Sequence, residues 1–127
     1  MLRASLLVVA VIAVAGFSQG PPDAAAHKSL MDDAGDAQED LRDAITAKSG
    51  PKAAELGAKI DALMKDTETY WQKKNAADGV KIAQDCEALA KQIVTAAKAN
   101  NFDQTGAAFA KMNTACSACH DLHLEKR

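Results

Sequence analysis

The sequence predicts an all-α protein, folded as an antiparallel up-down-up-down four-helix bundle. Apolar residues recur at alternating steps of three and four along four consecutive segments, which is the period of one helix face. Val, Ile and Thr are sparse after the N-terminal leader, and no segment shows the apolar–polar alternation of a half-buried strand. Short connections between helices favour sequential neighbours that run in opposite directions.

The first 20 residues resemble a secretory signal peptide and are not expected to join the fold. Arg3 precedes an apolar stretch from Ala4 to Ala15, which is too short to span a bilayer. Small residues follow, so we expect cleavage between residues 15 and 26, and a mature domain over residues 21–127. Export makes the periplasm the expected location, with no stable membrane anchor. The alternative is an uncleaved anchor.

The first two predicted helices meet at a Ser-Gly-Pro break. The first runs from His27 to Lys48, with its apolar stripe at Met31, Ala34, Gln38, Leu41 and Ile45. The second runs from Pro51 to Lys74, with its stripe at Ala53, Leu56, Ile60, Leu63, Thr67 and Tyr70. We expect Gly50 to end the first helix and Pro51 to start the second.

The third and fourth predicted helices are separated by the segment NNFD. The third follows the break NAADG and ends near Asn100, with its stripe at Ile82, Cys86, Leu89, Ile93 and Ala96. The fourth ends near Glu125, with its stripe at Thr105, Phe109, Met112, Cys116, Cys119 and His123. We expect Asn75 or Asp78 to cap the third helix, and Asp103 to cap the fourth.

Cys116, Cys119 and His120 form a C-x-x-C-H motif in the last predicted helix, and this motif has three established meanings. A redox dithiol of the thioredoxin type belongs beside a βαβ pattern, and this chain predicts no strand. A structural zinc site needs four ligands, whereas the other Cys and His residues form no matching second pair. In an exported protein the motif is typical of covalent haem attachment, which we expect here.

The spacing suits that chemistry. Cys116 and Cys119 lie three residues apart and share one helix face, so each thiol can add to one vinyl group of the same haem. His120 follows directly, and its imidazole can reach the iron. We therefore expect one covalently attached haem c per chain.

A leader, four helices and a C-x-x-C-H motif in the last helix resemble the class II c-type cytochromes, the family of cytochromes c prime and their low-spin relatives. The resemblance covers nearly the whole mature chain. It implies that Cys116 and Cys119 carry the thioethers and that His120 is the proximal iron ligand. The family often has Met, Leu or Phe in the first helix on the opposite haem face, and Met31 holds that place. We expect Met31 to be the distal ligand; the alternatives are a five-coordinate iron and ligation by His27.

The resemblance and the motif together predict an electron carrier that is not an enzyme. Ligation by His and Met raises the potential of a haem iron, and nothing in the sequence suggests a catalytic acid, a catalytic base or a substrate pocket. The alternative is a five-coordinate protein that binds nitric oxide or carbon monoxide at an open distal face. Incidental peroxidase activity, with His27 as its acid–base group, is a weaker alternative.

Charge limits the expected partners. The formal net charge is −2 at pH 7, and loss of Arg3 with the leader makes it more negative, which argues against nucleic acid. We expect redox partner proteins instead. The acidic run from Asp32 to Asp40 is a solvated face or a docking patch for a basic partner. The resemblance also implies a possible homodimer.

Several other residues have simpler expected roles. Met64 and Met112 should pack in the core. Cys86 should be a buried small apolar residue, with a disulfide-linked dimer or a haem contact as alternatives. His123 shares its helix with His120, so it should lie at the surface or behind the ligands.

Two pairs of neighbours lie near helix ends. Tyr70 and Trp71 should cover an open end of the bundle. The family tends to have an Arg one turn before the Met position. Here that place holds His27, followed by Lys28, and either side chain could contact a haem propionate.

Overall fold

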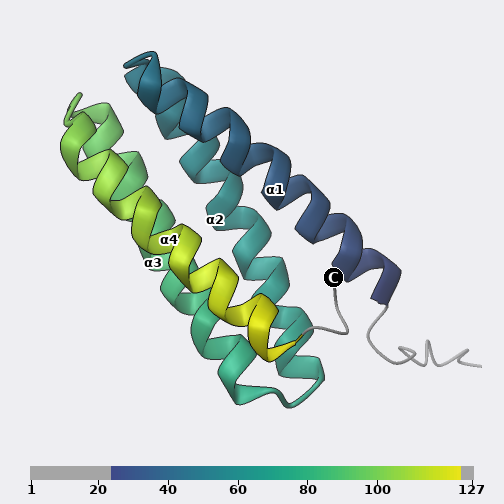
Figure 1. Cartoon of the computed structure of the whole chain (residues 1–127). Coiled ribbons are helices and arrows are strands. Elements are labelled where there is room, and N and C mark those ends of the chain that lie inside the picture. Colours follow the sequence, from purple (N-terminus) through teal and green to yellow (C-terminus); the bar gives the residue numbers. More distant parts are fainter. Residues whose placement is uncertain (1–23, 124–127) are drawn as a thin grey trace, which may run out of the picture.

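The structure, a computed structural model, describes residues 24–123, most of which lie in four α-helices (Figure 1). They are α1 (Ala24–Thr46), α2 (Gly50–Lys73), α3 (Ala77–Lys98) and α4 (Phe102–Leu122). Residues 24–123 contain no strand, so the predicted all-helical class and four-helix bundle are confirmed. The predicted leader and the last four residues lie outside this described part. Within residues 24–123, no helix combines the length and the apolar character needed to cross a membrane.

The connection between α1 and α2 corrects the prediction for Gly50. Lys48 makes the left-handed turn with φ of 53°, while Gly50 is already the first residue of α2. Gly50 is needed for a different reason: a Cβ atom there would lie 2.6 Å from the carbonyl oxygen of Ala97 in α3. Asn75 and Asn100 make the other two left-handed turns, each with φ of 54°. Asn tolerates this conformation better than most residues.

The predicted helix caps were also wrong in detail. The N-cap of α3 is Ala76, rather than Asn75 or Asp78. The N-cap of α4 is Asn101, whose side chain accepts a hydrogen bond from a backbone N–H of the first turn at 3.1 Å. Asp103 lies inside that first turn, where its negative charge interacts favourably with the positive end of the helix dipole.

The core consists mainly of Ala, with a few larger side chains at its centre. The largest fully buried side chains are those of Leu41, Ile60, Ile93, Met112, Thr105 and Cys86. Met64 and Met112 are both buried, as predicted. Small residues let neighbouring helices approach closely. At Gly57 of α2, for example, an added Cβ atom would lie 3.0 Å from methyl carbons of Ile93 and Val94 in α3.

The four helices do not contact one another equally. The contact of α2 with α3 is the most extensive, followed by α3 with α4 and α1 with α2. The contact of α1 with α4 is much smaller. Figure 1 shows α4 beside α3, with α1 beside α2. The bundle is therefore least closed between its first and last helices.

Candidate functional site

A cavity of about 100 Å³ lies where the beginning of α1 meets the last turns of α4, and all four helices contribute to its wall. It is lined by the four residues predicted to carry the haem thioethers or to bind the iron: Met31, Cys116, Cys119 and His120. The structure thus brings together residues that lie far apart in the sequence. The rest of the wall is largely apolar, and is made by residues such as Ala34, Gly35, Met64, Ile82 and Ala83.

Cys116 is the best-anchored residue of the motif. Its Sγ accepts a hydrogen bond from Nε2 of Gln38 in α1 at 3.5 Å, and it lies 3.9 Å from Sγ of Cys86 in α3. The hydrogen bond between the two sulfurs lowers the pKa of Cys116 and raises that of Cys86, which burial raises further. Cys116 is therefore the more readily ionised of the two thiols.

Cys119 has a different environment on the same helix face. It is half-buried, and burial raises its pKa to about 11. It is therefore a neutral thiol at pH 7. Of the two motif cysteines, only Cys116 has a hydrogen-bond donor that favours its thiolate.

The two expected iron ligands lie at the rim of the cavity. His120 is exposed near the end of α4, although it lines the cavity. Met31 is half-buried and packs against the apolar core from α1. The lining therefore includes an imidazole from α4 and a thioether from α1.

Aromatic rings close this end of the bundle, as predicted for Tyr70 and Trp71. The ring of His27, which is buried, stacks on Tyr70 with centroids 4.0 Å apart and an interplanar angle of 8°. Trp71 meets His27 edge-on at 5.3 Å. These contacts come from α1 and α2, and they fix the side of the cavity next to Met31. Lys28, the other predicted propionate contact, is exposed and pairs with Asp32 at 2.7 Å.

Of the two positions expected for His123, at the surface or behind the ligands, the surface position is wrong. Its side chain is only 15% exposed, because its ring packs on Trp71 with centroids 4.2 Å apart. Its Nε2 lies 3.2 Å from a carboxylate oxygen of Asp78 at the start of α3. The spacing of His123 along the stripe of the fourth helix was the signal that pointed inward.

The lining fits a haem in kind. It offers two thiols three residues apart, an adjacent imidazole, a thioether from another helix and an apolar wall. It also contains a buried donor, Nε1 of Trp71, which has no hydrogen-bond partner among residues 24–123. A buried donor of this type costs stability unless an acceptor, such as a carboxylate of a bound group, satisfies it.

The space itself is smaller than a porphyrin. A cavity of about 100 Å³ has room for about three waters. Binding a large planar group therefore requires the cavity to widen. The boundary between α1 and α4 is the natural place, because the contact of these two helices is much smaller than those of α1 with α2, α2 with α3 and α3 with α4.

Comparisons with known proteins give no relative: no family model, no curated protein and no solved structure matches the chain. Within residues 24–123, no group of three or more His, Cys, Asp and Glu side chains is arranged to hold a metal ion. What distinguishes this end of the bundle is the meeting of the Cys116–His120 segment with Met31 and with a third cysteine.

Proposed function

We propose that the protein is an exported c-type cytochrome that carries single electrons through one covalently attached haem c. The observation that carries this proposal is the cavity in which Cys116, Cys119 and His120 of α4 meet Met31 of α1. The resemblance to class II c-type cytochromes supports it, because the motif lies in the last of four helices. The periplasm is the proposed location, since covalent haem attachment of this type takes place outside the cytoplasm.

The proposal includes an antiparallel arrangement of the helices. Contacts between helix ends support it: Gly79 at the start of α3 lies against Trp71 near the end of α2, and Gly50 at the start of α2 lies against Asn100 beyond the end of α3. The beginning of α1 and the end of α4 line the same cavity. Each pair places the beginning of one helix beside the end of another.

Each residue of the proposed site has a definite task. Cys116 and Cys119 hold the group through two thioethers, which prevent its loss. His120 and Met31 would supply the two side-chain ligands of the iron. When bound, the haem supplies a one-electron iron couple, whose potential ligation by Met and burial in an apolar wall raise.

The remaining lining controls water and polarity. The Ala, Ile and Met side chains of the wall exclude water from the iron, which limits the solvent reorganisation that accompanies electron transfer. Trp71 supplies a buried N–H for an acceptor of the bound group. The stacked rings of His27 and Tyr70 hold Trp71 and the start of α1 in place.

A redox partner is part of the proposal. The acidic residues that follow Met31 along α1 are exposed, and they are Asp32, Asp33, Asp36, Glu39 and Asp40. A basic partner docked on this face would approach the cavity from the Met31 side. Attraction of this kind raises the association rate at low salt and weakens as ionic strength rises. The homodimer stays a prediction.

A second candidate function follows from open space beside Met31. A Cβ atom added to Gly35, one turn further along α1, would meet nothing within 4 Å. If Met31 does not bind the iron, this space admits a small diatomic ligand. The protein would then be a five-coordinate haem protein that binds nitric oxide or carbon monoxide.

Optical and EPR spectra of the purified ferric protein separate the two candidates. We expect low-spin signals and a Met-to-iron charge-transfer band, and we expect Met31→Ala to replace them with a high-spin spectrum and a ferrous form that binds carbon monoxide. Met64→Leu is the matched control, since Met64 lines the same cavity and should leave the spectrum unchanged. A wild-type protein that is already high-spin would contradict ligation by Met31 and support gas binding.

A further inference from the structure

The third cysteine has no task in the proposed haem site, yet it touches that site. Cys86 lies on α3 and is only 1% exposed. Its Sγ lies 3.9 Å from Sγ of Cys116, one of the two residues proposed to carry a thioether. An odd number of cysteines in an exported chain leaves one that can pair outside the motif.

The two sulfurs are close enough to bond without moving a helix across the bundle. A disulfide has an S–S length of about 2.05 Å, so the sulfurs must approach by about 2 Å, a distance that side-chain rotation can supply. Their helices, α3 and α4, are extensively packed neighbours. The hydrogen bond from Gln38 to Cys116 favours the thiolate, which is the form that attacks a disulfide.

We propose that Cys86 and Cys116 form a disulfide in the exported chain before haem is attached, and that this disulfide blocks attachment at Cys116. The block of haem attachment rests on the proposed function, whereas the disulfide itself does not. The disulfide makes haem loading depend on a reductant. It also explains why a buried thiol lies directly behind the first cysteine of the motif.

The reaction needs a disulfide oxidant, such as oxidised glutathione or the disulfide of an exchange protein. The Cys116 thiolate attacks one sulfur of the oxidant and releases one thiolate. The Cys86 thiolate then attacks the Cys116 sulfur of this mixed disulfide and releases the second. The two cysteines lose two electrons, the oxidant is reduced to two thiols, and the protons of Cys86 and Cys116 pass to them.

The alternative pairing is Cys116 with Cys119, within α4. Both residues lie on one helix face, whereas the sulfur-to-sulfur contact at 3.9 Å joins Cys116 to Cys86 of α3. The two pairings have different consequences. A Cys86–Cys116 bond ties α3 to α4, whereas a Cys116–Cys119 bond leaves α3 free.

Peptide mapping distinguishes these pairings. The full chain is exported into the periplasm of a host that lacks haem-attachment machinery, treated with oxidised glutathione, alkylated, and cut with trypsin without reduction. Trypsin releases Cys86 in peptide 82–91 and both motif cysteines in peptide 112–126. We expect the two peptides to be linked and Cys119 to be alkylated. The link should persist in Cys119→Ser and disappear in Cys116→Ser.

Two results would overturn the disulfide. One is a bond between Cys116 and Cys119 inside peptide 112–126, and the other is alkylation of all three cysteines after the oxidant. Cys86→Ser and Cys86→Ala, compared by circular dichroism, check that loss of the thiol leaves the helices folded.

Haem loading tests the block. In a host with attachment machinery, grown with a thiol oxidant, Cys86→Ala should raise the fraction of chains with covalent haem several-fold over wild type, and an added reductant should remove the difference. Equal loading under oxidising conditions would overturn the block. If wild type takes no haem even with reductant, the proposed function fails, while the peptide map still decides the disulfide.

Discussion

The seam between α2 and α3 and the cavity between α1 and α4 are built from similar small residues, but one is closed and the other is open. At the seam, Gly57 lets the helices approach until a Cβ would touch Ile93. At the cavity, Met31 is half-buried, His120 is exposed and α1 contacts α4 only slightly. The difference shows how a thin alanine core can hold a site: half of the bundle closes tightly, and the other half leaves space.

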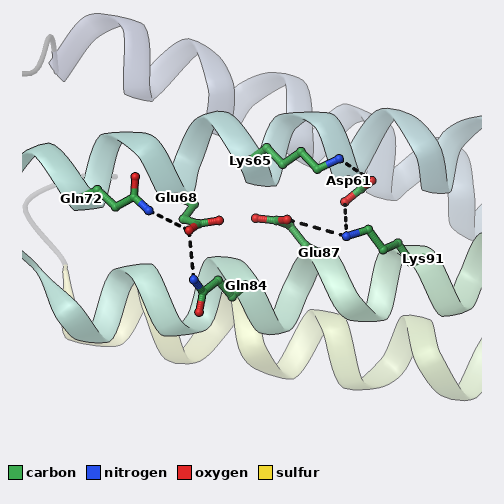
Figure 2. A network of polar contacts seen from close by, with 7 residues as sticks. All are labelled: Asp61, Lys65, Glu68, Gln72, Gln84, Glu87 and Lys91. Carbon is green, nitrogen blue, oxygen red and sulfur yellow. Dashed lines mark hydrogen bonds and ion pairs between the residues drawn. The ribbon is translucent and has the colours of Figure 1, made fainter.

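A network of polar side chains joins α2 to α3, and Figure 2 shows it along the seam. Asp61 of α2 lies 3.2 Å from Lys65 and 3.8 Å from Lys91 of α3. Glu68 accepts hydrogen bonds from Gln72 and from Gln84 of α3, at 2.8 and 3.0 Å. Exposed pairs of this type contribute little free energy each. Together they define the alignment of the two helices.

Glu87 is the costly member of this network. It is 8% exposed, and its pKa is raised by burial and by a hydrogen bond with Glu68. Figure 2 shows the two carboxylates pointing toward each other. Lys91 approaches Glu87 at 4.0 Å and offsets part of the cost. Burial in the contact of α2 with α3 therefore disfavours the charged form of Glu87.

The two regions should differ most in how much stability is lost when a large side chain is cut back to Ala. Ile93→Ala at the seam should lower the free energy of unfolding by about 2–5 kcal/mol, because it leaves a cavity among fully buried neighbours. Met31→Ala at the open side should cost the haem-free chain about 1 kcal/mol or less, since Met31 is only half-buried. Urea unfolding of both variants measures this. Equal losses would contradict the division into a closed half and an open half.

Substituting a glycine in each region should change the free energy of unfolding by a smaller amount, and in opposite directions. Gly57→Ala should destabilise the chain by about 1–3 kcal/mol, because the new methyl group meets carbon atoms of Ile93 and Val94 at 3.0 Å. Gly35→Ala should stabilise the haem-free chain by about 0.5–1 kcal/mol, because Ala favours a helix and the site is open. Thermal unfolding compares the two variants. If both stabilise, the seam is looser than described.

The smallest expected effect depends on pH. Because the folded pKa of Glu87 is raised above its usual value of 4.5, the folded chain binds the proton more tightly than the unfolded chain. The stability from this group is therefore greatest at low pH and is lost as pH rises through the raised value. Glu87→Gln should raise the Tm by about 2–5 °C at pH 7 and by almost nothing at pH 4.

Glu39→Gln is the matched control for Glu87→Gln. Glu39 is exposed on α1, so the substitution removes one negative charge without relieving a buried carboxylate. We expect its Tm to follow wild type at both pH values. A gain for Glu87→Gln that is the same at pH 4 and pH 7 would show that packing, not ionisation, is responsible.

The sequence predicted the helices and the places where they break, because the apolar period is regular, but it did not predict which residues make the turns. Glycine commonly ends a helix, yet the left-handed turn after α1 is made by Lys48 and not by Gly50. Gly50 is needed instead because α3 comes close to it. That approach depends on tertiary packing. The cap of α4 was missed although it is local: the side chain of Asn101, and not that of Asp103, accepts a hydrogen bond from the backbone N–H of Gln104.

The candidate site was partly predictable for a related reason. The motif at Cys116, Cys119 and His120 is a local pattern, and Met31 followed from the resemblance to a family. The contact of Cys86 with Cys116 depends on the rotation of α3 against α4, which no local pattern determines. The stacking of His27 on Tyr70 likewise needs two helices in register.

The most direct test of the central proposal is the intact mass of the denatured chain after export in a host with haem-attachment machinery. We predict the mass of the chain without its leader plus one haem, and the loss of that addition in the Cys116→Ser, Cys119→Ser double variant. A mass equal to the polypeptide alone under reducing conditions, or a haem that dissociates on denaturation, would contradict the proposal.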